Sequence, residues 1–202
     1  MKILGLDPSK RSTGFALWQE GWVTARYGHW QLGSEYSSDG MVFAKIHRNL
    51  ADLFSLARFD MIYYEQPIHP AQLTGATNIH TIRLAAGIAA HIESFAHAKR
   101  CRLVKSVNVQ NWRPDFIGRL PAAEANARSR RLKKAGDPKA SARSELKSLT
   151  MERARQLGFN PAVDDEADAL AILDYALSLN GVVPPWRRQE VLRPALGMGA
   201  AA

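Results

Sequence analysis

Apolar positions along this chain follow two different periods, which predict strands and helices in turn. Five short apolar runs have the length and the β-branched or aromatic content of strands, namely 2–6, 13–18, 22–32, 61–65 and 103–107. Glu20-Gly21 lies between the second and third runs and indicates a hairpin turn. The chain is therefore expected to open with three consecutive strands.

The remaining periodic segments repeat apolar residues every three or four positions, as one face of an amphipathic helix does. They cover about 39–58, 78–97, 144–157 and 165–179. The order of strands and helices favours an α/β fold with one mixed sheet and helices on both faces. Right-handed crossovers would then place the first and fourth strands side by side and parallel.

Acidic residues stand at the ends of these predicted elements. Asp7 follows the first run and Glu65 follows the fourth, while Asp165 and Asp168 are three residues apart at the start of the last helix and so share one face. Ligands of open α/β sheets bind at the carboxyl ends of the strands. Carboxylates gathered there suit hard cations such as Mg²⁺, and a pair of such ions supports phosphodiester chemistry.

Each acidic position also has a purely structural interpretation. Asp165 and Asp168 resemble a capping box at the start of a helix. Asp7 precedes a polar turn that an aspartate side chain can cap, and Glu65 suits an ion pair with an arginine at the end of the sheet. These alternatives stay open on the residues alone.

Length and composition are those of one globular domain. The 202 residues are 46% apolar, and we expect a domain over 1–180 with a mobile basic excursion at about 119–143 and a poorly ordered tail over 181–202. The single cysteine excludes an internal disulfide framework and a cysteine-based zinc cluster. No membrane-length apolar run and no secretory leader are present, so we expect a soluble cytoplasmic protein.

Positive charge is concentrated in one part of the chain. The net charge is +8, yet residues 99–155 hold sixteen Lys or Arg against five Asp or Glu. Clustered cations favour nucleic acid as the partner, with acidic proteins or a membrane surface as alternatives. The candidates for contact with DNA phosphates are Arg128, Arg130, Arg131, Lys133 and Lys134, unless that stretch is simply a solvated loop.

Three motifs, taken in order, resemble the RuvC family of Holliday junction resolvases within the RNase H-like superfamily. They are ILGLDPSKRSTGFAL at 3–17, MIYYEQP at 61–67 and DDEADALAILDYAL at 164–177, and the resemblance covers roughly residues 1–112 and 144–179. It implies an RNase H-like fold whose five strands have the order 3-2-1-4-5. It also implies that Asp7, Glu65, Asp165 and Asp168 are catalytic and bind the metal.

The resemblance further implies an activity. Members of this family cut four-way junctions at symmetric positions as homodimers with two Mg²⁺ ions, for which Mn²⁺ can substitute. Lys147 is similar in placement to a basic residue near the scissile phosphate, and the large basic stretch is similar to phage and prophage members. Ser9 and Ile68 depart from the pattern, since the family commonly has glycine and an aromatic wedge there.

Other functions fit parts of the sequence. A debranching nuclease of broad specificity, which also cuts flaps and forks, would use the same carboxylates, as would a nuclease for RNA–DNA hybrids. A protein that grips branched DNA without cutting it would keep the fold but has no need of four acids. An actin-like phosphotransferase shares the opening strand and acidic turn, but it requires a second lobe for which 202 residues leave no room.

Overall fold

The computed structural model describes residues 1–67, 79–137 and 140–188. A single five-stranded sheet has the order β3-β2-β1-β4-β5, which confirms the predicted order. Its strands are β1 (Lys2–Asp7), β2 (Thr13–Gln19), β3 (Arg26–Trp30), β4 (Met61–Glu65) and β5 (Leu103–Val107). β3 is shorter than the predicted run over 22–32. The mixed α/β architecture expected from the order of elements is therefore present.

Strand β1 lies at the centre of the sheet and sets the register of its neighbours. It pairs antiparallel with β2, and it pairs parallel with β4, where Leu6 lies opposite Tyr64. β4 continues parallel to β5, and β2 pairs antiparallel with β3. Asp7 and Glu65, each the last residue of its strand, thus end neighbouring parallel strands at one edge of the sheet.

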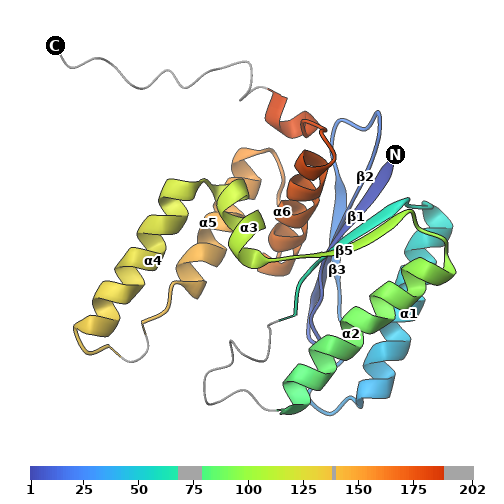
Figure 1. Cartoon of the computed structure of the whole chain (residues 1–202), viewed down its shortest axis with the longest axis horizontal. Coiled ribbons are helices and arrows are strands. Elements are labelled where there is room, and N and C mark those ends of the chain that lie inside the picture. The colour runs from blue at the N-terminus through green and yellow to red at the C-terminus, as the bar shows by residue number, and fades with distance from the viewer. Residues whose placement is uncertain (68–78, 138–139, 189–202) are drawn as a thin grey trace.

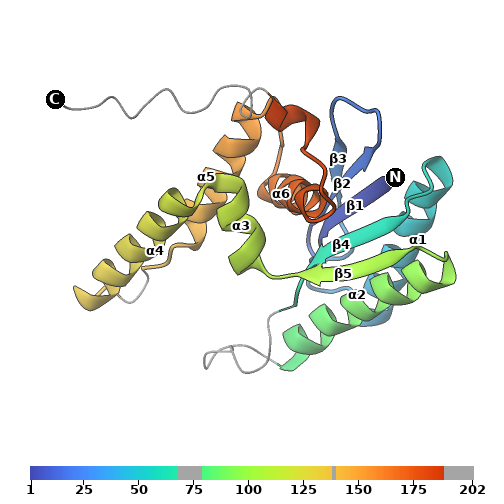
Figure 2. The ribbon, with the colours of Figure 1, turned by 45° about the horizontal axis from the view of Figure 1, so that its top comes forward.

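Helices cover both faces of the sheet (Figure 1; Figure 2). One face packs against α1 and α2, and the other packs against α6, with α3, α4 and α5 extending outward beyond it. The helices are α1 (Asp39–Leu56), α2 (Ile79–Ala98), α3 (Val109–Ile117), α4 (Arg119–Lys134), α5 (Arg143–Gln156) and α6 (Asp164–Leu179), followed by the short 3-10 helix η2 (Pro185–Arg187).

Alternation along the strands distributes side chains between two cores. Ile3, Met61 and Tyr63 are buried on the face covered by α6, whereas Leu4 and Ile62 are buried on the face covered by α1 and α2. This period of two decides which way the last residue of each strand points. No helix in the described part of the chain is long and apolar enough to cross a membrane.

The stretch predicted to be a mobile basic excursion contains a regular helix over residues 119–134. Helix α4 follows Gly118, whose φ of +96° suits glycine, and its buried face consists of Ala122 and Ala125. Alanine, arginine and lysine are strong helix formers, but a buried face made of alanine gives almost no apolar periodicity. Gly136, at φ +94°, ends the helix.

Two residues near the start of the predicted tail pack against the domain. Trp186 packs against the ring of Phe159, with 5.2 Å between the ring centroids, and its Nε1 donates to Asp174 Oδ1 at 2.7 Å. Arg187 Nε donates to the same carboxylate at 3.0 Å. Because Asp174 is fully buried in α6, it requires such donors. Residues 189–202 and Ile68 lie outside the described residues.

Candidate metal-binding active site

Three elements bring the predicted carboxylates to one place. Asp7 continues the alternation of Ile3 along β1, and Glu65 continues that of Tyr63 along β4, so both carboxylates lie on the face of the sheet that α6 covers. α6 carries Asp165 and Asp168 in its first two turns over the same face. The charges of the other three carboxylates all act on Asp7, so the four side chains lie near one another and are called here the acidic site.

Glycines let α6 approach the sheet closely enough for this meeting. A Cβ atom built on Gly5 would lie 2.8 Å from the backbone nitrogen of Leu173, and one built on Gly14 would lie 1.8 Å from the backbone oxygen of Asp165. Neither distance is tolerated between real atoms. Gly14 is also the partner of Asp7 in the β1–β2 register. The helix therefore rests its acidic first turn directly beside the end of β1.

The capping alternative for the last helix does not hold in the structure. α6 begins at Asp164 after Val163, and its N-cap receives no side-chain hydrogen bond. The acid that does bind local backbone is Glu166, whose Oε2 accepts from the Ala162 amide at 2.7 Å and whose Oε1 lies 2.7 Å from His29 Nδ1. Glu166 is thus structural, which leaves Asp165 and Asp168 available to the acidic site.

The turn after β1 is closed by hydroxyl groups rather than by Asp7. Ser9 Oγ donates to the Ser12 carbonyl at 2.6 Å, and Thr13 Oγ1 donates to the Ser9 carbonyl at 2.7 Å. Within the described residues, no hydrogen bond reaches the Asp7 carboxylate. Ser9, which departs from the family pattern, therefore organises this turn by its side chain, and Asp7 remains free of a capping role.

Burial and mutual repulsion act strongly on the carboxylates that end the strands. Burial raises the pKa of Asp7 well above its ordinary value, and the charges of Glu65, Asp168 and Asp165 raise it further, against an opposing effect of Lys147. Burial followed by the charge of Asp168 raises the pKa of Glu65 to about 7. A nearby positive charge would favour the ionised form of these carboxylates.

An arginine supplies part of that missing positive charge. Arg113 Nη2 donates to Asp168 Oδ2 at 2.7 Å, and the side chains of the two residues are only 11% and 3% exposed. The guanidinium carbon lies 4.5 Å from the ring centre of Trp112, which is fully buried. The sequence gives no sign of this ion pair, because nothing in it connects α3 with α6.

Lys147 reaches the same site from α5. Its Nζ forms a close ion pair with Asp164 and lies 4.0 Å from Asp165 Oδ1. It also contributes to the pKa of Asp7, Glu65 and Asp168, in each case lowering it. The structure therefore places this predicted residue beside the acidic site, with its side chain one quarter exposed and open to a substrate.

The donor set of the acidic site fits Mg²⁺. Glu65 Oε2 and Asp168 Oδ1 are buried without a hydrogen-bond partner among the described residues, as expected of oxygens that a cation would satisfy. The described residues contain no group of three or more His, Cys, Asp or Glu side chains arranged to hold one ion. Mg²⁺ needs no such group, because it takes one or two carboxylates and completes its shell with waters and phosphate oxygens.

The five predicted DNA-binding cations all lie on α4, but not in equivalent surroundings. Arg128 Nη2 lies 3.5 Å from Glu145 Oε1, so its charge is partly neutralised. Arg130 and Lys133 line a groove between α4 and the start of α5, whereas Arg131 and Lys134 are exposed outside that groove. The structure thus places two of the five in that groove.

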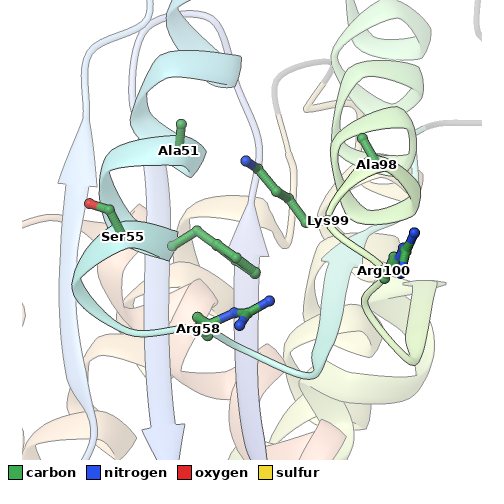
Figure 3. A pocket seen from close by; sticks show the side chains of 7 residues that line it. Ala51, Ser55, Arg58, Ala98, Lys99 and Arg100 are labelled. Atoms are coloured by element: carbon green, nitrogen blue, oxygen red, sulfur yellow. The ribbon is translucent and has the colours of Figure 1, made fainter.

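A second basic pocket lies at the other end of the strands, between the ends of α1 and α2 (Figure 3). Lys99 Nζ lies 5.7 Å from the ring centre of Phe54, and Arg58 lies over the same ring at 5.6 Å. Cations just past the end of a helix stabilise its negative end. Helix termination and stacking account for these residues, so this pocket is not the candidate site.

The sheet order, its two helical layers and the acidic edge define the RNase H-like fold of Holliday junction resolvases. RuvC from Thermus thermophilus, solved with a Holliday junction substrate, has a TM-score of 0.59 and 14% identity over 90% of this chain and 96% of its own. The yeast mitochondrial resolvase Ydc2 gives 0.51 and 11% over 93% of this chain and 79% of its own.

The fowlpox virus Holliday junction resolvase gives a TM-score of 0.50 at 12% identity, over 89% of this chain and 99% of its own. No protein-family model matches the sequence, and no curated protein matches it. At identities this low the comparisons establish the shared fold. The chain thus has the fold of RuvC-type resolvases over nearly its whole length.

Proposed function

We propose that this chain is a metal-dependent endonuclease that cuts branched DNA, resolving four-way Holliday junctions by paired symmetric nicks. The observation that carries the proposal is the acidic site, in which carboxylates from β1, β4 and α6 converge on a fold shared with solved resolvases. A protein that only gripped DNA would gain nothing from buried, mutually repelling acids beside a polyanion.

In this proposal Asp7, Glu65, Asp165 and Asp168 hold two Mg²⁺ ions, for which Mn²⁺ can substitute. When bound, the ions supply a nucleophilic water and stabilise the attacking and leaving oxygens of the phosphodiester. Lys147 holds a phosphate oxygen of the substrate beside Asp165, and Arg113 fixes the orientation of Asp168 through its charge-assisted hydrogen bond.

Paired nicks in a two-fold substrate suit a two-fold protein, so we include a homodimer in the proposal. The candidate interface is the small face of α2, namely Ala85, Ala86, Ala89 and Ala90. Ala89 is packed in the core, whereas Ala86 and Ala90 are exposed and available to a partner. Branched DNA of a bacterial cell or of a phage-infected host would be the substrate.

The test is cleavage of an end-labelled immobile four-way junction in Mg²⁺, beside flap, fork, duplex and RNA–DNA hybrid substrates. Asp7→Asn should abolish cutting while leaving junction binding intact, because it removes a ligand without removing any basic residue. Asp52→Asn, at an exposed position of α1, is the matched control and should cut like the unchanged protein.

Symmetric nicks confined to the junction would support the proposal. Equal cutting of flaps and forks would instead indicate a debranching nuclease of broad specificity. Preferred cutting of the RNA–DNA hybrid would mean that the substrate is such a hybrid and not branched DNA. Tight junction binding without cutting in either Mg²⁺ or Mn²⁺ would contradict the enzymatic proposal and leave a DNA-binding protein.

A further inference from the structure

A polar groove separates α4 from α3 and the start of α5. It has a volume of about 680 Å³, and its walls include Arg113, Asn126, Arg130, Lys133, Ser141 and Arg143. Among the described residues, no aspartate or glutamate lines it. In both views α4 and α5 lie side by side, extending away from the sheet (Figure 1; Figure 2). We refer to this groove as the basic groove.

The basic groove is continuous with the acidic site. Arg113 belongs to both, because it lines the groove and donates to Asp168. Arg143, at the start of α5, lies close enough to Glu65 for its charge to lower the pKa of that carboxyl. A chain of phosphates that enters the acidic site could therefore continue past Arg113 and Arg143 into the groove.

The groove cations are unneutralised within the part of the chain that the structure describes. Arg130, Lys133 and Arg143 have no carboxylate partner there, in contrast to Arg128 beside Glu145. The groove also receives the amino end of α5, whose N-cap has no side-chain hydrogen bond. Unpaired guanidinium groups beside the positive end of a helix favour an anion with several oxygens.

Helix geometry separates two sets of cations on α4. Asn126, Arg130 and Lys133 are spaced by four and three residues, so they share the face that lines the groove. Arg131 and Lys134 have the same spacing of three and the same combined charge but occupy another face, outside the groove. Arg131 and Lys134 can therefore serve as a control that has the same charge as Arg130 and Lys133 but a different position.

We propose that the basic groove holds the DNA strand next to the scissile phosphate, contacting its backbone through Arg130, Lys133 and Arg143. This inference rests on the proposed function. From Asn126 to Lys133 the helix rises about 10 Å, so this face of α4 can lie along a short stretch of the strand. Contacts to phosphates add affinity and fix the position of the strand without reading its sequence.

The experiment compares Arg130→Ala/Lys133→Ala with Arg131→Ala/Lys134→Ala on the full chain. Binding to a fluorescent four-way junction is followed by anisotropy in Ca²⁺ across a salt series. The groove variant should bind about tenfold or more weakly, and its slope of log affinity against log salt should fall by about 2. The control variant should change affinity by less than about threefold.

Equal losses in both variants would overturn the proposal, because they would show that α4 acts as a diffuse charged surface. No loss in either would overturn it as well. Thermal melts of both variants check folding, and Arg143→Gln tests the groove from a second helix with the same expected loss. Cleavage by the unchanged protein is measured in parallel, so failure of the groove and failure of the nuclease are told apart.

A cross-link gives a second, independent measurement. In a Cys101→Ala background, Ser129→Cys places a thiol in the groove wall, and Ala127→Cys places one on α4 outside it. Junction DNA with a disulfide tether on a backbone phosphate beside the cleavage position should cross-link to the first variant and not to the second. Cross-linking of equal yield at both positions would contradict the proposed strand path.

Discussion

Gly14 of β2 lies directly against the backbone oxygen of Asp165 in α6, so close that a Cβ atom on Gly14 would be 1.8 Å from it. This contact joins the strand beside Asp7 to the first turn of the acidic helix. Because the obstructing atoms are backbone, no side-chain rotation can relieve a larger residue. The approach of the helix to the sheet, and with it the geometry of the acidic site, depends on this glycine.

Gly14→Ala should therefore separate α6 from β2. We expect the free energy of unfolding to fall by about 2 kcal/mol or more and junction cleavage to be lost even below the melting temperature. Chemical denaturation and the cleavage assay measure the two effects. Gly40→Ala is the control: that glycine lies in the first turn of α1 with nothing near its Cβ position, so alanine should stabilise by up to about 1 kcal/mol. Full activity of Gly14→Ala would contradict this account.

The strands and the helix that carry the acidic residues could be predicted from the sequence. Asp7 and Glu65 each end a short continuous apolar run, and a side-by-side parallel arrangement of those runs puts both acids at one edge. Helix α4 was missed because its buried positions are alanine, which contributes little to apolar periodicity. The strength of a pattern thus depends on the size of the buried residues as well as on their spacing.

The contributions of Arg113 and Arg143 were beyond sequence reasoning for another reason. Arg113 is fifty-five residues from Asp168, and no periodic signal predicted the helix that carries it. Where a basic residue meets a carboxylate depends on the packing of α3, α5 and α6, which follows from shape and not from spacing. The contacts of Trp186 and Arg187 were also beyond sequence reasoning, because these side chains satisfy the buried Asp174, which the sequence does not reveal.

Arg113→Gln should destabilise the metal-free protein at neutral pH by about 3 kcal/mol, because it leaves a buried carboxylate without its counter-charge. Mg²⁺ should restore part of that loss, since a bound cation replaces the missing charge. Arg113→Lys keeps the charge but loses the planar stack on Trp112 and should be intermediate. Arg48→Gln, on the exposed surface of α1, serves as the control in the same denaturation series. Equal stability of the Arg113→Gln and unchanged proteins would argue against the ion pair.

Stability of the metal-free protein should fall as the pH rises from about 4.5 to about 7. Burial and the charge of Asp168 raise the pKa of Glu65 from 4.5 to about 7, so the folded state binds this proton more tightly than the unfolded chain does. Protonation of Glu65 therefore contributes on the order of 3 kcal/mol to the free energy of unfolding. This contribution is full below pH 4.5 and is lost by about pH 7.

Asp7 and Asp168 shift in the same direction and add to that slope. Glu65→Gln should flatten this pH dependence of stability, whereas Glu152→Gln, on the exposed side of α5, should leave it unchanged. Saturating Mg²⁺ should offset the loss of stability at higher pH, because the ion favours the ionised carboxylates. Denaturant midpoints across the pH range measure the effect. A stability that rises over this range in metal-free buffer would contradict the electrostatic picture of the site.

Lys147→Gln should reduce the rate of junction cleavage by on the order of 100-fold while changing junction affinity by less than about twofold. Its ammonium group lies beside Asp164 and Asp165, where it would meet one phosphate and not a long stretch of backbone. Single-turnover cleavage and anisotropy separate the two quantities. Arg155→Gln removes one cation from the exposed surface of the same helix and should alter neither. A loss confined to affinity would assign Lys147 to binding alone.

Arg187→Gln should destabilise the fold by about 3 kcal/mol without altering the acidic site, because Asp174 is fully buried and would lose its charged partner. Burial raises the pKa of Asp174 to about 6, so the loss should shrink below pH 6, where this carboxyl is protonated. Asp174 lies about 9 Å along α6 from Asp168, so cleavage at low temperature should be unchanged.

Arg188→Gln removes a neighbouring exposed charge and should change neither the stability nor the cleavage. If the double variant Asp174→Asn/Arg187→Gln recovers stability, the cost of the single variant lies in the unpaired buried charge; a double variant as unstable as the single one would place that cost in lost packing of the segment after α6.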